Sequence, residues 1–248
     1  MKKLFVTLSI GDKYVKEYES LFAPSQRAYA KKFDYDFKII DEFIYKKIPH
    51  NDTISFNKIL AFCQEWSEQY DYIAFVDADI FINPDSPDLI DNLADKTKVG
   101  VVDEYSQPTK DLRIEVQKMK GWETSAKDYY KLAGFDLDTE RVINTGVILA
   151  NPKIHGDMFK SIHYKHVLSS IGHYRYFHFE QSAIGYQLQK NNLCEFLDNK
   201  FNAVWGIHKL SKPSLSIENF AERNYFTHLA GKTNFEKVPD LNKKFGFK

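Results

Sequence analysis

The stretch YDYIAFVDADIFINP, residues Tyr70 to Pro84, constrains the fold more than any other part of this chain. An apolar run from Ile73 to Val76 leads directly into Asp77-Ala78-Asp79, and apolar residues resume at Ile80. A short run of β-branched and aromatic residues between polar turn signals is typical of a fully buried strand in an α/β sheet. Because burying unpaired carboxylates is costly, two aspartates at the end of such a strand indicate a cationic partner.

Asp77 and Asp79 stand two residues apart, and residues i and i+2 of a strand point to the same side. Both carboxylates can therefore converge on one ion. Hard oxygen ligands of this kind suit Mg²⁺ or Mn²⁺, which commonly keep open coordination positions for the phosphates of a substrate. Since a D-x-D tripeptide on its own is more often a solvated turn, the prediction of a metal site depends on its position after a buried strand.

The length and charge of the chain narrow the class of protein. Its 248 residues suffice for one large α/β domain or two small ones, and a hydrophobic content of 43% supports a sizeable core. Lys and Arg together number 34, as do Asp and Glu, so the formal net charge is zero. This balance argues against general binding to nucleic acid or to a membrane surface, although a local basic patch is compatible with it.

Apolar runs and cysteines indicate where the protein works. No run approaches the roughly 20 apolar residues of a membrane span, so we expect no integral membrane segment. The apolar run Leu4 to Ile10 is short and precedes no small-residue cleavage site, which favours a first strand over a signal peptide. Cys63 and Cys194 stand in apolar surroundings and are expected to be free thiols, as in a reducing, cytoplasmic compartment.

Strand and helix patterns alternate along the chain, which predicts an α/β fold with a mainly parallel central sheet. No repeat or low-complexity linker divides residues 1–248, so one domain is the simpler assignment. Residues 106–140 are polar with two weak helical patterns, and we expect them to form an insertion over the site that determines specificity. Strands are expected at Lys3–Ser9, Tyr35–Ile40, Lys98–Tyr105 and Arg141–Pro152, after 193 and after 224, and helices at 14–33 with a break at Pro24, 59–70, 156–170 and 178–189.

Loops at the carboxyl ends of parallel strands build the ligand site of such sheets. The loop after the first strand offers four residues that could contact a nucleotide: Thr7, Ser9, Asp12 and Tyr14. Lys58 falls in the first turn of a predicted helix, where the helix dipole disfavours a cation. A nearby phosphate would explain this lysine, and a solvated lysine stem is the alternative. Asn144-Thr145-Gly146 interrupts a predicted strand, and a glycine there often marks the close approach of a backbone or ligand.

Histidines gather in the region of the predicted 156–170 helix and beyond it, at His163, His166, His173 and His178. His163 and His166 are one helical turn apart, a spacing from which a zinc site could be built. No carboxylate or thiol completes such a site locally, so structural histidines are the alternative.

Several fragments occur in an order that resembles one family. They are R-x-Y-A at 27–30 before a YDF strand, a helix with Lys58, the D-x-D strand, the N-T-G strand, E-Q-S-A from Glu180, and H-x-x-G-K from His228. Together they resemble the metal-dependent glycosyltransferases of the GT-A fold. The likeness spans nearly the whole chain and is greatest to the groups of bacterial lipopolysaccharide α-galactosyltransferases, glycogenin and fungal galactosyl/mannosyl transferases. It implies a single Rossmann-like domain with a nucleotide-binding half, 1–105, and an acceptor-binding half, 106–248.

The resemblance implies a ligand set for the metal. Asp77, Asp79 and His228 would hold Mn²⁺, or Mg²⁺, and the ion would bridge the diphosphate of a nucleotide sugar, most simply a UDP-linked one. A mixed shell of carboxylate and imidazole is reasonable for Mn²⁺. Gly231 would let the backbone approach the phosphates, and Lys232 would pair with them.

The resemblance also implies catalytic residues. Glu180-Gln181 matches an acidic-Gln pair near the anomeric carbon, although the family usually has aspartate where this chain has the longer glutamate. Asn144-Thr145-Gly146 would contact the donor sugar or the glycan or glycoconjugate acceptor. Retention or inversion of the anomeric centre stays open, because inversion needs a general base for which Asp103, Glu104 and Glu180 all qualify.

Three other functions are compatible with part of this sequence pattern. A phosphatase of the haloacid dehalogenase type also places D-x-D after an apolar strand, but it needs the motif near the N-terminus and a later acidic pair. A sugar nucleotidyltransferase would need a Gly-rich N-terminal loop, which this sequence lacks. A non-catalytic carbohydrate-binding domain or scaffold would have no use for a complete set of metal ligands.

Overall fold

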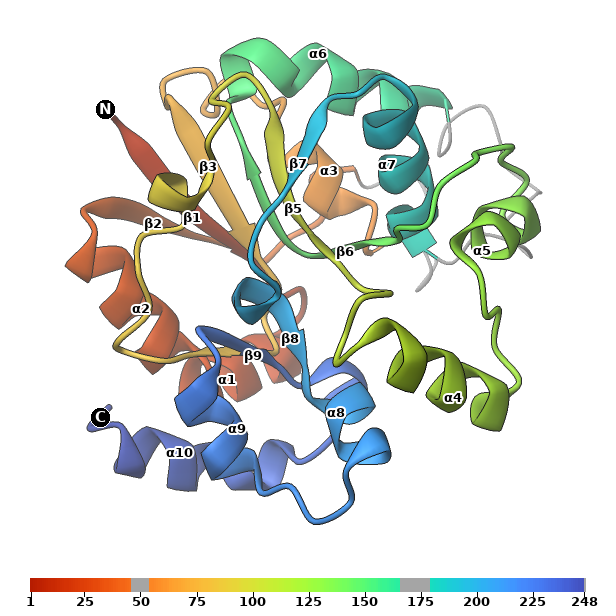
Figure 1. The fold of residues 1–248 in the computed structure, drawn as a ribbon. Coiled ribbons are helices and arrows are strands. Elements are labelled where there is room, and N and C mark those ends of the chain that lie inside the picture. The colour runs from red at the N-terminus through yellow and green to blue at the C-terminus, as the bar shows by residue number, and fades with distance from the viewer. Residues whose placement is uncertain (46–53, 166–178, 248) are drawn as a thin grey trace.

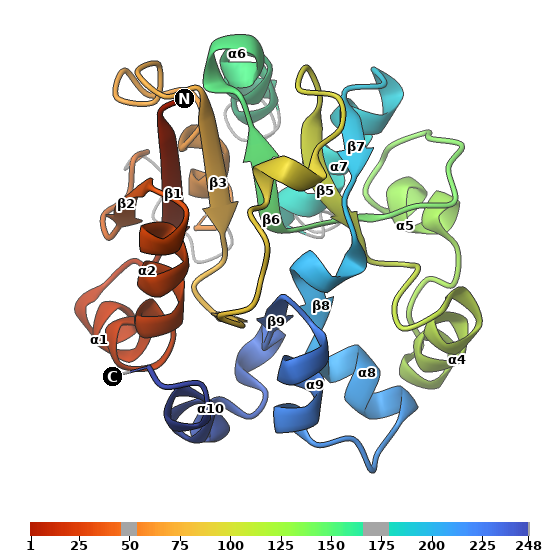
Figure 2. The same ribbon diagram turned by 60° about the vertical axis from the view of Figure 1, so that its left-hand side comes forward.

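The computed structural model describes residues 1–45, 54–165 and 179–247, and it contains two sheets. The larger sheet has the strand order β2-β1-β3-β6-β5-β7, and the smaller has the order β4-β9-β8 (Figures 1 and 2). In the larger sheet only β6 runs antiparallel to its neighbours. The expected α/β class with a mainly parallel central sheet is confirmed. The strands are β1 (Lys3–Leu8), β2 (Tyr35–Ile40), β3 (Tyr72–Val76), β4 (Ile80–Ile82), β5 (Val99–Asp103), β6 (Ile143–Ala150), β7 (Cys194–Phe196), β8 (Ala203–Val204) and β9 (Phe226–His228).

Helices cover both faces of the larger sheet (Figure 1). Alternate residues of each strand enter different cores, as the two-residue period of a strand requires. In β3, Ile73 and Phe75 join the core beneath α3, α6 and α7, whereas Ala74 and Val76 join the core beneath α2 and the smaller sheet. The α-helices are α1 (Asp12–Leu21), α2 (Ala23–Lys32), α3 (Asn57–Leu60), α4 (Lys110–Lys120), α5 (Ala126–Leu132), α6 (Pro152–His163), α7 (Phe179–Lys190), α8 (Trp205–Ser211), α9 (Ile217–Arg223) and α10 (Val238–Lys244), with short 3₁₀ turns between them.

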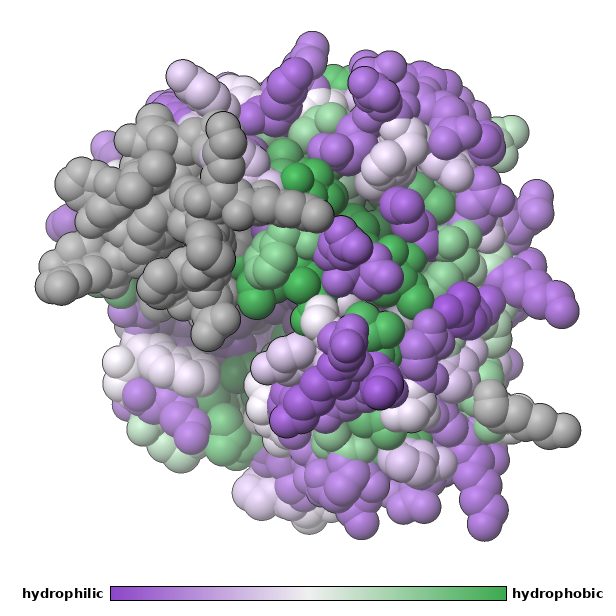
Figure 3. All heavy atoms as spheres, turned by 180° about the vertical axis from the view of Figure 1, so that it is seen from behind, coloured by the Kyte–Doolittle hydropathy of each residue, from purple (hydrophilic) through white to green (hydrophobic). Residues whose placement is uncertain are grey.

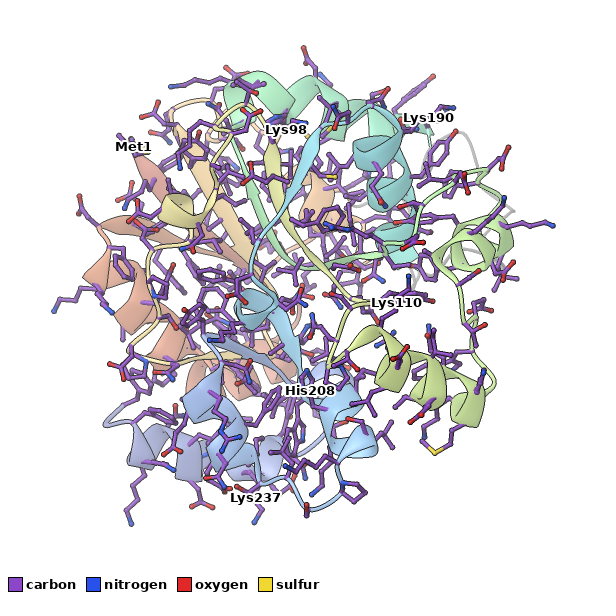
Figure 4. All side chains as sticks on the ribbon, in the orientation of Figure 1. Met1, Lys98, Lys110, Lys190, His208 and Lys237 are labelled. Carbon is purple, nitrogen blue, oxygen red and sulfur yellow. The ribbon has the colours of Figure 1, made fainter. Side chains whose placement is uncertain are left out.

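The insertion between β5 and β6 forms α4 and α5, as its two weak helical patterns predict. Thr109 and Ser125 cap these helices with side-chain oxygens, and α4 ends at Gly121, whose φ of 67° favours glycine. Figure 4 labels Lys110 at the start of α4 and His208 on α8. Helices α4 and α8 pack together through Val116 and Ile207. The insertion is thereby fixed against the smaller sheet.

Two expected elements differ in the structure. The helix expected over 59–70 is a single turn, α3, followed by turns that join residues i and i+3. Ser67 causes part of this, because its hydroxyl donates to the carbonyl of Ala61 and accepts from the amide of Gln64, which competes with helical bonding. The strand around Asn144-Thr145-Gly146 is continuous, since all three residues belong to β6.

The sequence patterns did not predict α8, α9 or α10, each of seven residues. Together with α1, these helices bury the outer face of the smaller sheet around Phe81 and Trp205. No helix within the described ranges is both long and apolar enough to cross a bilayer. On the face opposite to the one seen in Figure 1, hydrophobic residues form a patch between hydrophilic side chains (Figure 3).

Candidate functional site

The D-x-D motif lies where the chain passes from one sheet to the other. Val76 ends β3 in the larger sheet and Ile80 begins β4 in the smaller one, so Asp77 and Asp79 occupy the turn between them. The backbone N–H of Asp77 donates to the carbonyl of Gly146 at 2.8 Å. Gln26 closes the turn from α2, because its amide donates to the carbonyls of Asp77 (3.0 Å) and Ile80 (2.9 Å). The two carboxylates are therefore held by a fixed turn.

His228 reaches the same place from β9. It pairs with Ile80 across the antiparallel β4–β9 ladder, and its Nε2 lies 3.2 Å from Oδ1 of Asp79. Asp77, Asp79 and His228 each offer a ligand atom, and these atoms lie within 4.8 Å of one another. The predicted convergence of these three side chains is confirmed. It arises from the β4–β9 pairing within the smaller sheet and from the turn between β3 and β4, rather than from one face of a single strand.

Electrostatics at this cluster reflect a concentration of negative charge. Burial raises the pKa of Asp77, and the charge of Asp79 adds to that rise. Burial also acts to raise the pKa of Asp79, but its ion pair with His228 outweighs burial and lowers that pKa. Burial acts to lower the pKa of His228, and the two aspartates outweigh it, so the pKa of His228 is raised. The side chains of Asp77 and Asp79 are 24% and 27% exposed, respectively, so an ion can reach both carboxylates.

Lys58 connects the D-x-D turn to α7. Its Nζ lies 2.9 Å from Oδ1 of Asp77 and 2.6 Å from Oε1 of Glu180, and it donates to the carbonyl of Thr145 at 3.4 Å. Burial acts to lower the pKa of Lys58, but the two carboxylates outweigh burial and raise it. The lysine is thus a buried, charged link between residues from three elements.

Two clefts meet at this link and share Ser55, Lys58 and Asp77. The first has a volume of about 440 Å³ and a largely apolar and aromatic wall. The second has a volume of about 580 Å³ and a wall rich in carboxylates and amides. The first cleft is also lined by Leu8, Ser9, Ile10, Tyr14, Glu17, Tyr18, Phe22, Ile54, Ala78, Asp79, Lys232 and Phe235. The second is also lined by Glu104, Tyr105, Arg113, Gln117, Trp122, Glu123, Tyr129, Asn144, Thr145, Gly146, Glu180, Gln181, His228 and Ala230.

Most of the sequence-predicted residues fall on one of these walls. Ser9, Tyr14, Ala78 and Lys232 line the first cleft, and the Nζ of Lys232 lies 2.6 Å from Glu17 and over the Tyr14 ring. The second cleft is lined by five further predicted residues: Asn144, Thr145, Gly146, Glu180 and Gln181.

Three other predicted residues stand apart from these walls. Thr7 is buried in β1, and Asp12 lies in the first turn of α1. Gly231 has a φ of 73°, a conformation that glycine adopts at little cost, and it belongs to the turn between His228 and Lys232.

Glu180 and Gln181 begin α7 and face the second cleft with their hydrogen bonds already made. Oε1 of Glu180 accepts from Oγ1 of Thr145 at 2.7 Å, in addition to its contact with Lys58. The amide of Gln181 donates to Glu104 (3.0 Å) and to the Tyr129 hydroxyl (3.2 Å). Both side chains are consequently held in one orientation toward the cleft.

Arg113, Tyr129 and Asn202 belong to this polar network, and the sequence patterns did not single them out. Nη2 of Arg113 donates to Oε1 of Glu104 at 2.6 Å, and this pairing outweighs burial and lowers the pKa of Glu104. Arg113 and Tyr129 lie in the weakly patterned insertion, and Asn202 ends the short 3₁₀ helix Asn199–Asn202. These three residues share a polar side chain at a buried position, and that is the one signal by which they could have been identified.

Other candidates from the sequence lie elsewhere. Of the three possible general bases, Glu104 and Glu180 line the second cleft, whereas Asp103 accepts from the backbone of Tyr105 and lies 4.0 Å from Arg141. His163 packs against the Tyr45 ring, and burial lowers the pKa of His163 to about 4. His166, His173 and His178 lie outside the described residues, so the alternative of a zinc site there stays a prediction. Cys63 and Cys194 are both free thiols.

Neither a family model nor a curated protein matches the sequence, but solved structures match the fold. A glycosyltransferase involved in the glycosylation of the major capsid of PBCV-1 has a TM-score of 0.61 and 12% identity, over 97% of this chain and 99% of that one. The bifunctional glycosyltransferase WbbM has a TM-score of 0.64 and 14% identity, over 96% of this chain and 49% of that one. The galactosyltransferase LgtC, in complex with donor and acceptor sugar analogues, has a TM-score of 0.55 and 13% identity, over 97% of this chain and 95% of that one.

The chain thus has the fold of these glycosyltransferases, and the predicted GT-A architecture is confirmed. Its Asp77, Asp79 and His228 cluster agrees with the D-x-D class of that fold. Identities of 12–14% make this likeness a statement about architecture.

Proposed function

We propose that this protein is a metal-dependent glycosyltransferase that moves a sugar from a nucleotide-sugar donor, a UDP-linked one, to a glycan or glycoconjugate acceptor. One observation carries the proposal. The Asp77, Asp79 and His228 cluster lies at the junction of an apolar, aromatic cleft and a cleft whose wall is rich in carboxylate and amide side chains. A donor has the same division, since a flat base and a hydroxylated sugar lie on opposite sides of a diphosphate.

The residues of the cluster fit a divalent cation. Two carboxylates and one imidazole make a mixed oxygen and nitrogen ligand set that suits Mn²⁺, and Mg²⁺ is the alternative. Nδ1 of His228 is already bonded to Asn202 at 2.8 Å, so Nε2 is the nitrogen that faces the aspartates. When bound, the cation would neutralise the charge that develops on the nucleoside diphosphate as the glycosidic bond breaks.

We place the nucleotide in the first cleft. Tyr14 is 52% exposed there and offers an aromatic face to the base, and Ser9 offers a hydroxyl. Lys232 would pair with the phosphates, and the turn at Gly231 would bring the backbone near them. In this arrangement Lys58 neutralises the acidic side of the cluster while its stem stays buried.

We place the transferred sugar and the acceptor in the second cleft. Glu180 and Gln181 face it with fixed side chains and would act at the anomeric carbon, and Asn144, Thr145 and Gly146 line the wall beside them. Trp122 is 48% exposed at this cleft, and its ring would stack on a pyranose of the acceptor.

The two clefts are lined largely by different halves of the chain. We propose that residues 1–105 bind the nucleotide and that residues 106–248 bind the acceptor. Most of the first cleft comes from before residue 80, with Lys232 and Phe235 added, whereas most of the second comes from residue 104 onward. The two free cysteines support a reducing, cytoplasmic location.

A thermal-shift screen of nucleotide sugars with and without Mn²⁺ tests the function. A donor that binds the native state raises Tm, and we expect that rise to require the metal. Asp79→Ala should abolish turnover and metal-dependent UDP binding while the fold is retained. Retained turnover in this variant would refute the assignment. Metal-independent sugar binding without donor hydrolysis would instead identify a carbohydrate-binding domain.

A further inference from the structure

The ring of His228 rests against the backbone of Gly146. A Cβ added at Gly146 would lie 2.7 Å from Cε1 and 2.8 Å from Nδ1 of that ring, distances that real Cβ atoms do not show. Gly146 has ordinary strand geometry within β6, so no special φ calls for glycine here. The glycine of the N-T-G motif is therefore needed to make room for the imidazole.

Asn144 has only one possible amide orientation. Its side chain meets the backbone N–H of Gly146 at 2.9 Å, which can only donate, and the carboxylate of Glu104 at 3.2 Å, which accepts because its pKa is low. The atom facing Gly146 must therefore be Oδ1, and the atom facing Glu104 must be Nδ2.

The orientation of Asn144 determines that of Asn202 and then that of the histidine. Oδ1 of Asn144 can only accept, so the Asn202 atom lying 2.7 Å away must be Nδ2. The other atom of that amide is Oδ1, and it lies 2.8 Å from Nδ1 of His228. Because this oxygen only accepts, Nδ1 of His228 must carry the proton. Asn202 is fully buried, so water does not replace it.

We propose that Asn144, Gly146 and Asn202 form a positioning device for His228. The device holds the ring in the Nδ1–H tautomer and keeps Nε2 as the nitrogen that can offer a lone pair toward Asp77 and Asp79. The N-T-G motif thus serves the metal cluster as well as the second cleft. The role in metal binding rests on the function proposed above, whereas the tautomer is a property of the protein alone.

The tautomer can be measured by NMR on metal-free protein labelled with ¹⁵N-histidine, at a pH where His228 is neutral. The His228 signals are assigned by their loss in His228→Gln. We expect wild-type protein to show a protonated Nδ1 and Asn202→Leu to lose that preference. Asn202→Asp keeps an oxygen that accepts from Nδ1, and its second oxygen, which faces the accepting Oδ1 of Asn144, would carry a proton and donate it there. This variant should therefore keep the tautomer, which provides a rescue if the leucine variant folds poorly. An unchanged tautomer in Asn202→Leu, or an Nε2–H tautomer in wild-type protein, would overturn the proposal.

The affinity for Mn²⁺ alone, measured by the electron paramagnetic resonance of free ion, gives the second readout. Loss of a partner that orients a metal-ligating histidine typically weakens metal binding about 10–100-fold, and we expect this of Asn202→Leu. Asn242→Leu is the matched control, because Asn242 is also a buried asparagine but bonds to Leu21 in another core. Equal Mn²⁺ affinities in the two variants would overturn the metal role. Wild-type protein that binds no Mn²⁺ would instead refute the proposed function, and the tautomer would still decide the positioning device.

Discussion

Lys58→Met tests the electrostatics on which the whole site depends. The substitution keeps an apolar stem of similar length and removes the charge that lies 2.9 Å from Asp77 and 2.6 Å from Glu180. Removing one partner of a buried ion pair costs about 3–5 kcal/mol, because the other charge is left uncompensated. The partial exposure of Asp77 reduces this, since water can reach its carboxylate.

An upper limit for the Lys58→Met penalty comes from protonation. Raising the pKa of an ordinary aspartate from about 3.9 to 7 corresponds to about 4 kcal/mol, and a carboxylate that costs more than this at pH 7 takes up a proton instead. We therefore expect the free energy of unfolding to fall by about 3 kcal/mol. At roughly 2–4 °C per kcal/mol for a chain of this size, Tm should fall by about 6–12 °C.

The direction of the pH dependence follows from the same reasoning. Without the lysine, the folded-state pKa of Asp77 rises further, so the penalty is full at neutral pH and shrinks as pH falls toward 5. Mn²⁺ should also restore more stability to Lys58→Met than it adds to wild-type protein, because the cation replaces the missing positive charge beside Asp77. Calorimetry at pH 5 and pH 7, with and without Mn²⁺, measures both effects.

Lys3→Met is the matched control for Lys58→Met. Lys3 forms a part-buried ion pair with Asp88 at 2.9 Å, at the N-terminal end of β1, and lines neither cleft. This variant should lose stability without becoming more responsive to Mn²⁺. If Tm of Lys58→Met decreases by less than about 2 °C, or if Mn²⁺ stabilises both variants equally, the reasoning is refuted.

Three further predictions concern other parts of the site and fold. Gly146→Ala should displace the His228 ring and weaken Mn²⁺ binding at least 10-fold, measured with Mn²⁺ alone, because the added Cβ meets the ring at 2.7 Å; unchanged affinity would contradict this. Trp122→Ala should raise KM for the acceptor and leave donor hydrolysis unchanged, and a variant with altered hydrolysis but normal acceptor KM would argue against stacking. Burial lowers the pKa of His208 to about 4, so this residue should cost the protein about 2 kcal/mol between pH 6.5 and 4 as the unfolded chain takes up the proton first. In denaturant titrations at several pH values, His208→Gln should make the slope shallower by this amount and leave the share of His163, whose pKa burial also lowers to about 4.

The sequence predicts what depends on local pattern. The bounds of β2 agree at both ends, and the break at Pro24 becomes the start of α2. The helix expected over 59–70 does not form, although Ile59, Trp66 and Tyr70 have helical spacing. Successive turns, rather than one helix, bring these three side chains to the same core. Spacing alone does not distinguish these two structures.

The network around the clefts could be predicted only in part, because its members meet through tertiary contacts. Arg113 lies in a helix with a mixed polar pattern, and its buried pairing with Glu104 depends on how α4 packs against the smaller sheet. Asn202 has no motif around it, and its role follows from a chain of amide orientations that begins at Gly146. Such residues become recognisable once the strand pairing is known.

The pairing of β4 with β9 explains why a residue near position 228 completes a site that begins at position 77. The apolar run through the D-x-D motif splits between two sheets, and the motif occupies the turn that this change of sheet requires. β4 is short and needs a partner, and its register with β9 sets His228 opposite Ile80, one residue beyond Asp79. The same register brings the imidazole onto Gly146 of β6, which in turn is bonded to the backbone of Asp77. Each ligand of the cluster is thus positioned by backbone pairing, either of Asp77 with β6 in the larger sheet or of β4 with β9 in the smaller one. Slippage of β9 by one residue would turn His228 to the opposite face and remove it from the cluster.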